Sequence, residues 1–209
     1  MPHWISNGGK MRPIHYLAAA TITVGVTGAV IVLAGPAIAG RPGPPAGSVD
    51  DSRLSGPGVD ISVTIPAGWH QIHDRSHPQL PQMVYPNTCS TGVGCAFALA
   101  SVLSTPAVSA RTAAEAAEHA VTSQPGIQGA TIISAGPTQI AGRNGYSVRF
   151  MYSQSNAKLQ AETAAVETGP FSSGMIPMSL IFVTVSDLTG APPASVIDQI
   201  VDSAQLTGR

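Results

Sequence analysis

IPMSLIFVTV, residues 176–185, is the most apolar of the strand candidates in the C-terminal half of the chain, and it decides the class of fold. Its β-branched and aromatic residues predict a buried strand at the centre of a sheet. Upstream, GYSVRFMY (residues 145–152) alternates between apolar and polar positions, which predicts a half-buried strand. A weaker strand is expected at residues 162–168. The order predicts consecutive strands that pair with one another.

Further elements lie upstream of this block. VDISVTI, residues 59–65, alternates as a half-buried strand does, and Pro66 and Gly68 close it. Apolar character predicts three more extended segments, at residues 83–85, 95–103 and 130–134. The run at residues 95–103 could also form a buried helix, but its position favours a strand. Asn144 and Gly145 form a hairpin-type turn signal between two strands.

Two helices are predicted. TAAEAAEHAV, residues 112–121, has Thr112 and Glu115 at the spacing of a capping box, and alanines form one face. Residues 196–204 repeat apolar side chains at helical spacing, with Asp198 on the opposite side. Because strands outnumber helices and run consecutively, the fold class is α+β. We expect an antiparallel sheet of about five to seven strands, with the two main helices packed on one face.

The N-terminal segment, residues 1–39, has the three parts of a secretory signal peptide in order. Lys10 and Arg12 precede residues 17–34, which carry no charge, and Ala37 and Ala39 form a cleavage motif before Gly40. The alternative is an uncleaved anchor, because 18 helical residues span about 27 Å. Both readings export the rest of the chain to the cell envelope or beyond. Residues 40–57 are rich in Pro and Gly and are predicted to be a linker, followed by one domain at residues 58–209.

Charge excludes one class of function. The chain has 10 Lys and Arg against 11 Asp and Glu. There is no basic excess to neutralise phosphates, so nucleic acid is not an expected partner.

The order of elements resembles the Mog1/PsbP-like fold, and within it actinobacterial exported proteins of the LpqN lipoprotein type. The resemblance rests on ISVTIPAGW (residues 61–69), the Ala-rich helix, the strand around Tyr146 and the final strand and helix. The lipobox cysteine of those lipoproteins is missing. The resemblance implies a non-enzymatic accessory or binding module of the cell envelope, whose partner is an envelope protein or a lipid or glycolipid. It implies no cofactor.

Cys89 and Cys95 are the only cysteines of the chain. Outside the cytoplasm a disulfide between them would persist, and the loop that it closes contains Gly92 and Gly94. We predict a structural disulfide. A redox pair would more often have two intervening residues.

His70, His73 and His77, with Asp74, form the one cluster that resembles a set of metal ligands. The segment lies between a strand and Pro78, so a long helix that would gather these side chains is not expected. Solvated histidines are the simpler interpretation, and a metal-binding envelope protein is kept as an alternative.

The sequence contains no motif for nucleophilic catalysis, because no G-x-S-x-G elbow occurs. An envelope hydrolase that uses a loop serine and a histidine remains an alternative. Arg143 and Arg149 flank the strand around Tyr146 and are candidates for binding an anionic head group. The leading hypothesis is an exported, non-catalytic binding protein.

Overall fold

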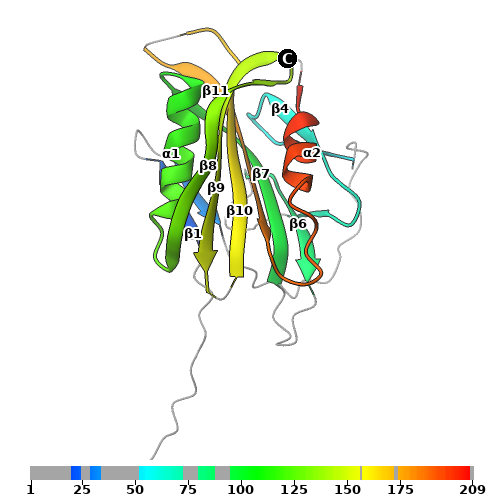
Figure 1. Cartoon of the computed structure of the whole chain (residues 1–209). Coiled ribbons are helices and arrows are strands. Elements are labelled where there is room, and N and C mark those ends of the chain that lie inside the picture. Colours follow the sequence, from blue (N-terminus) through cyan, green and yellow to red (C-terminus); the bar gives the residue numbers. More distant parts are fainter. Residues whose placement is uncertain are drawn as a thin grey trace, which may run out of the picture.

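The structure is a computed structural model, and its largest element is a seven-stranded antiparallel sheet (Figure 1). The order across the sheet is β5-β6-β7-β11-β10-β9-β8. The model describes residues 20–24, 29–33, 52–72, 80–87, 95–155, 157–171 and 174–207. The strands of the large sheet are β5 (His70–Ile72), β6 (Gln82–Asn87), β7 (Cys95–Ala107), β8 (Ile127–Ile140), β9 (Arg143–Gln154), β10 (Ala157–Glu167) and β11 (Ile176–Ser186).

The remaining elements are short. A three-stranded sheet has the order β12-β4-β3, and two helices complete the domain. These elements are β3 (Arg53–Leu54), β4 (Ile61–Thr64), β12 (Gln205–Leu206), α1 (Ala110–Thr122) and α2 (Val196–Asp202). The prediction of an α+β fold with an antiparallel sheet and two main helices is confirmed.

The predicted central strand, β11, is the fourth of the seven strands and lies between β7 and β10. Its side chains alternate between two separate cores. Ile181, Val183 and Val185 point into one core, whereas Leu180 and Phe182 point into the other. Both faces of this strand are covered by other parts of the protein. Neither face therefore needs a row of polar side chains, and the run is apolar on both.

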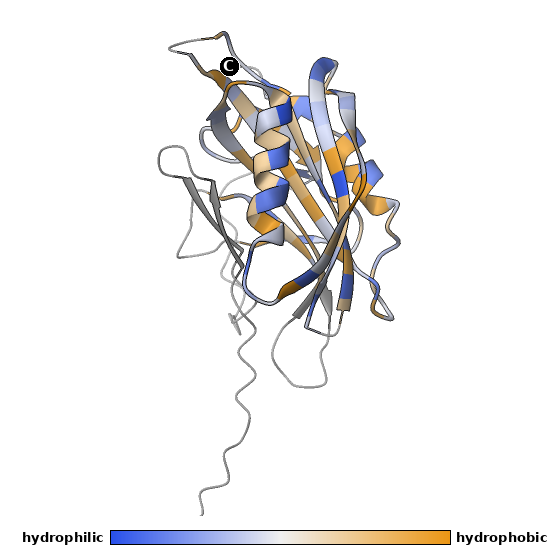
Figure 2. Ribbon diagram, turned by 60° about the vertical axis from the view of Figure 1, so that its left-hand side comes forward, coloured by the Kyte–Doolittle hydropathy of each residue, from blue (hydrophilic) through white to orange (hydrophobic). Residues whose placement is uncertain are grey.

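Helix α1 covers one face of the sheet through a stripe of small residues. Ala110, Ala113, Ala114, Ala117 and Val121 are its buried positions. In Figure 2 the strands are mostly hydrophobic, whereas α1 carries hydrophilic residues at intervals. Alanine side chains allow a close approach between helix and sheet, and the buried hydroxyl of Thr163 on β10 donates a hydrogen bond to the Ala114 carbonyl at 2.9 Å.

Helix α2 covers the other face together with the small sheet. Its buried residues Val196, Ile197, Ile200 and Val201 join the core that contains Ile181 and Val183. The prediction that both helices lie on one face is therefore wrong, and Figure 1 shows the strands passing between α1 and α2. The physical reason is the central strand, whose second apolar face would otherwise remain exposed to water.

The folded region begins before residue 58. Leu54, at 0% exposure, lies in the same core as Ile61. Arg53 donates hydrogen bonds to the Ser62 hydroxyl at 2.9 Å and to the Ser203 carbonyl, at the end of α2, at 2.8 Å. The predicted linker thus ends before Ser52 rather than at residue 57. The single leucine of that segment was the signal that it contributes to a core.

The N-cap of the first helix lies three residues earlier than the capping-box prediction placed it. Ser109 is the N-cap, and its hydroxyl accepts a hydrogen bond from the Thr112 amide at 3.1 Å. Thr112 therefore lies inside the helix. Arg111 and Glu115, which lie one turn apart on its exposed side, form an ion pair at 2.8 Å.

Residues 17–34 are described in two parts. β1 (Ala20–Val24) and β2 (Ala29–Leu33) pair antiparallel. Among the residues that the structure describes, no helix is long and apolar enough to span a membrane. Ala37, Ala39 and Gly40 lie outside the described residues, so the cleavage site stays a prediction.

Candidate functional site

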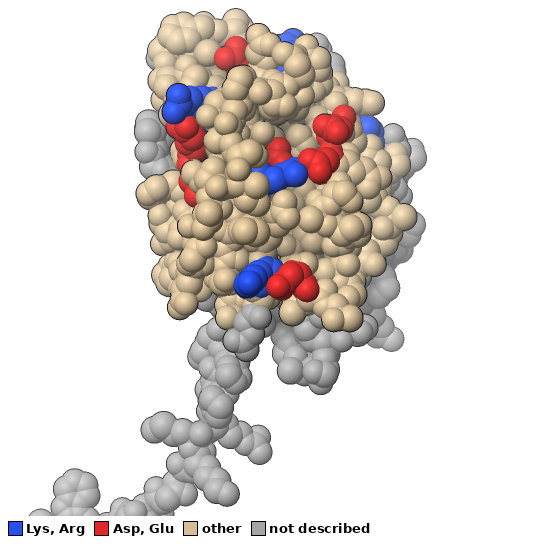
Figure 3. Space-filling view, in the orientation of Figure 1, with Lys and Arg blue, Asp and Glu red and all other residues tan. Residues whose placement is uncertain are grey.

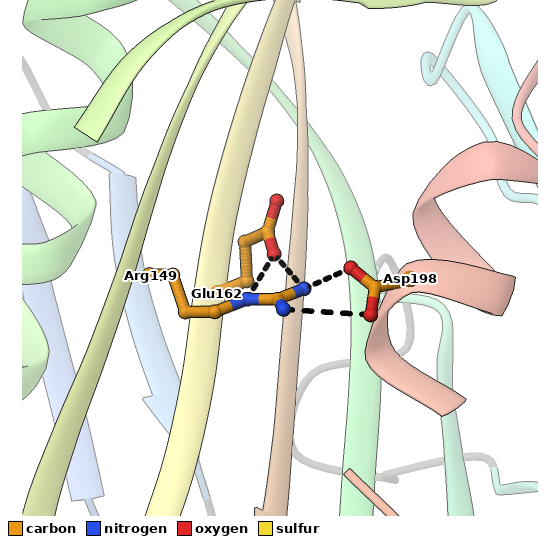
Figure 4. Close-up of polar contacts among 3 residues, drawn as sticks. All are labelled: Arg149, Glu162 and Asp198. Carbon is orange, nitrogen blue, oxygen red and sulfur yellow. Dashed lines mark hydrogen bonds and ion pairs between the residues drawn. The ribbon is translucent and has the colours of Figure 1, made fainter. Parts of the chain in front are cut away.

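Three charged side chains meet between the large sheet and α2 (Figure 4). Arg149 projects from β9, and Glu162 lies beside it on β10, in direct register. The Arg149 Nε and Nη2 atoms donate to Glu162 Oε2 at 2.9 and 2.6 Å. The same guanidinium also pairs with the carboxylate of Asp198 on α2. The cluster therefore joins two strands to a helix that is distant in sequence.

Burial differs across this cluster. The exposed fraction of the side chain is 9% for Glu162, 20% for Arg149 and 55% for Asp198. Desolvation by burial opposes the charge of Arg149, but the hydrogen bonds to Asp198 and Glu162 outweigh it and raise the pKa of the guanidinium above its ordinary value. Arg149 is thus occupied by two carboxylates, one on the neighbouring strand and one on α2.

A separate pocket lies at the end of the sheet, where the β8–β9 turn approaches the end of β10. Its volume is about 340 Å³, and its lining is mostly polar. The Arg143 guanidinium donates to the backbone carbonyl of Glu167 at 3.3 Å. The lining residues are Gly142, Arg143, Asn144, Glu167 and Gly169.

The pocket depends on a tight turn. Ala141 and Gly142 both have positive φ, of 52° and 75°, and connect β8 directly to β9. Two residues of positive φ match the twist of a hairpin and fix the direction of the following strand. The turn predicted at Asn144 and Gly145 is therefore displaced toward the N-terminus, and both of those residues lie inside β9.

Position 145 of β9 requires a glycine because the neighbouring strand β10 passes very close to it. A Cβ atom at this position would lie 2.6 Å from the Ala165 carbonyl oxygen and 2.8 Å from Ile140 Cδ1. The glycine signal in the sequence thus reports a close contact between strands rather than a turn.

Polar groups in the pocket are held by few contacts. Asn144 Oδ1 accepts a hydrogen bond from Gln139 Nε2 at 2.7 Å. One Arg143 nitrogen is committed to the Glu167 carbonyl. The residues that line the pocket thus include the Arg143 guanidinium, the Asn144 amide and the Glu167 backbone carbonyl, a set that can bind an anionic group next to a hydroxyl or amino group.

A large apolar side chain lies close to this pocket in sequence. Phe171 is two residues beyond Gly169 and is 68% exposed. Elsewhere, charged side chains are sparse. On the face shown in Figure 3, positive and negative groups lie next to one another in small groups, and no basic patch forms there.

The predicted metal and disulfide sites fall largely outside the described residues. His70 is exposed on β5, whereas His73 and His77 are not described. No group of three or more potential metal ligands occurs within the described part of the chain. Cys89 lies outside the described residues, and Cys95 begins β7 without a described side chain. The disulfide between them stays a prediction.

Comparisons with known proteins give a likeness of fold only. No protein-family model and no curated protein matches the sequence. One similar solved structure is LpqN, involved in cell envelope biogenesis of Mycobacterium tuberculosis, with 12% identity, a TM-score of 0.45, and coverage of 71% of this chain and 83% of that one. Another is PsbP from Synechocystis sp. PCC 6803, with 16% identity, a TM-score of 0.46, and coverage of 78% and 98%.

Sequence reasoning found Arg143 and Arg149 but missed their partners. Glu162 lies in the strand that was predicted as weak, and its charge gave no indication that it would be buried. Asp198 was placed on the polar side of its helix, and that side proves to contact Arg149.

Proposed function

We propose that this chain is an exported cell-envelope binding protein that holds the polar head group of an amphiphilic ligand, without catalysing a reaction. The observation that carries the proposal is the polar pocket beside Arg143. The pocket, of about 340 Å³, is open to solvent and mostly polar, which suits the head group of a ligand rather than a whole enclosed molecule. Export is proposed from the charged and apolar pattern of residues 1–39.

The chemistry of the pocket indicates the kind of head group. Arg143 can form paired hydrogen bonds with a phosphate or carboxylate. The Glu167 backbone carbonyl can accept a hydrogen bond from a hydroxyl or amino group. The favoured head group therefore has one anionic group flanked by hydroxyl or amino groups. Phe171, exposed nearby in the chain, offers an apolar surface to the remainder of an amphiphile.

Native mass spectrometry of the full chain, recovered from its own envelope fraction, tests this proposal. We expect an added mass in the range of a lipid or glycolipid. The Arg143→Gln variant should lose this added mass, because the neutral amide of glutamine cannot replace the paired, charged hydrogen-bond donors of the guanidinium. Arg111→Gln is the matched control, since Arg111 is an exposed arginine on α1 whose ion pair is with Glu115.

Three results would contradict the proposal. The first is an added mass that is unaffected by Arg143→Gln. The second is a bare polypeptide that also fails to bind vesicles of phosphatidylglycerol, a lipid whose head group combines a phosphate with hydroxyls. The third is turnover of ester substrates by the purified chain, which would make the protein an enzyme.

A further inference from the structure

The edge strand β8 is long, open and uncharged. It pairs with β9, and with no other strand that the structure describes (Figure 1). Across its 14 residues, IQGATIISAGPTQI, there is no Lys, Arg, Asp or Glu. Soluble proteins usually protect such an edge with charges, because its free peptide groups can pair with another strand. β8 has no charged residue for this purpose, and its protection consists of Pro137 and two register shifts, which leave the isoleucines between them exposed.

Apolar side chains are exposed along this edge. Ile132 is 55% exposed and Ile133 is 47% exposed, and the register shift between Ile132 and Ser134 makes Ile133 the extra residue of a bulge, so the usual alternation of faces does not separate the two isoleucines. Met151, the register partner of Thr131 on β9, is 45% exposed. The apolar surface therefore lies along the edge and is centred on the two isoleucines.

The sequence of β8 is nearly symmetric about this centre. Residues 129–136 read Gly-Ala-Thr-Ile-Ile-Ser-Ala-Gly, and reversal exchanges only Thr and Ser. Antiparallel pairing of two identical strands about a twofold axis places each residue opposite its mirror position. We propose that two copies of this chain associate through β8, with the twofold axis between Ile132 and Ile133.

This register makes the central pairs complementary. Ile132 lies opposite the partner's Ile133, and Thr131 opposite the partner's Ser134, which allows a hydrogen bond between hydroxyls. Alanines and glycines face each other beyond them, and no like charges meet. The large sheets of the two copies then form one continuous sheet.

The irregularities of β8 favour a second copy over an unrelated extended peptide. Gly129, Ala130 and Ile133 have no register partner on β9, which marks bulges. Bulges increase the local twist, so a strand that pairs well must be twisted in the same way. A second β8 carries the same bulges. The inference is independent of the ligand proposal, because none of the residues that line the pocket belongs to β8.

Sedimentation velocity of the full chain, in mild detergent, tests the association. We expect a dimer that the double substitution Ile132→Lys and Ile133→Lys weakens about a hundredfold, because like charges then face each other across the axis. Leu188→Lys is the matched control, since Leu188 is 43% exposed on the loop before α2. Circular dichroism of each variant verifies that the fold is retained.

Disulfide trapping tests the register. Chains with Thr131→Cys and chains with Ser134→Cys are mixed and oxidised, and mass spectrometry identifies the linked peptides. We expect the link between positions 131 and 134 in the mixture. A monomer at the highest soluble concentration, a dimer unaffected by the lysines, or trapping only at another register overturns the proposal.

Discussion

Removing Arg149 should destabilise the protein far more than removing Asp198, although both belong to one cluster. Arg149→Met keeps most of the apolar stem but leaves the Glu162 carboxylate, with a 9% exposed side chain, without its cation. Breaking a fully buried pair destabilises by about 3–5 kcal/mol, and we expect about 2–3 kcal/mol here because Arg149 is partly exposed. Asp198→Asn removes a carboxylate that is 55% exposed, and we expect about 0–1 kcal/mol.

The assay is equilibrium unfolding in urea at neutral pH, which gives the free energy of unfolding of each variant. Glu162→Gln combined with Arg149→Met completes a double-mutant cycle. In the double variant no buried charge is left without a partner, so its loss should be smaller than the sum of the two single losses. Equal losses for Arg149→Met and Asp198→Asn, or simple additivity in the cycle, would refute the assignment of the loss to an unpaired Glu162.

Two further predictions concern packing and alkaline pH. Gly145→Ala places a Cβ 2.6 Å from the Ala165 carbonyl oxygen, so we expect about 1–3 kcal/mol of destabilisation in urea. Gly136→Ala on β8, where a Cβ meets nothing within 4 Å, should change little, and a comparable loss there would contradict the packing argument. Burial raises the pKa of Tyr152 to about 12, which its hydrogen bond to Thr184 only partly opposes. The unfolded tyrosine ionises near pH 10, so this contribution to stability is complete below pH 10 and is lost toward pH 12, by about 3 kcal/mol. Melting curves of the wild type should therefore fall more steeply over this window than those of Tyr152→Phe, and parallel curves would contradict the expectation.

Local pattern alone located most of the strands. The alternation of Val148, Phe150 and Tyr152 against Arg149 and Met151 predicted the faces of β9, because neighbouring residues of a strand point in opposite directions. The continuous apolar run at residues 176–185 predicted the centre of the sheet for the same reason. The turn and the helix cap were predicted at the wrong residues. Gly145 is a glycine because another strand passes close to it, and Ser109 rather than Thr112 caps the helix.

The candidate site was only partly predictable. Arg143 and Arg149 were recognisable in the sequence as charges near a strand. Their interaction partners differ, because these partners lie far away in the sequence. Arg149 meets Asp198, which lies 49 positions further along the chain, whereas Arg143 meets the end of β10. No spacing rule connects such residues.

The sequence by itself determined the α+β class, the succession of strands and the two apolar helix faces, because these depend on the periodicity of neighbouring residues. Only the tertiary structure decided that α1 and α2 take opposite faces, that Leu54 belongs to the core and that Arg149 is neutralised. It also brought Arg143 beside Glu167 and left β8 at an open edge. These outcomes depend on which segments meet in space, and burial, charge pairing and edge exposure arise only once the whole sheet has formed.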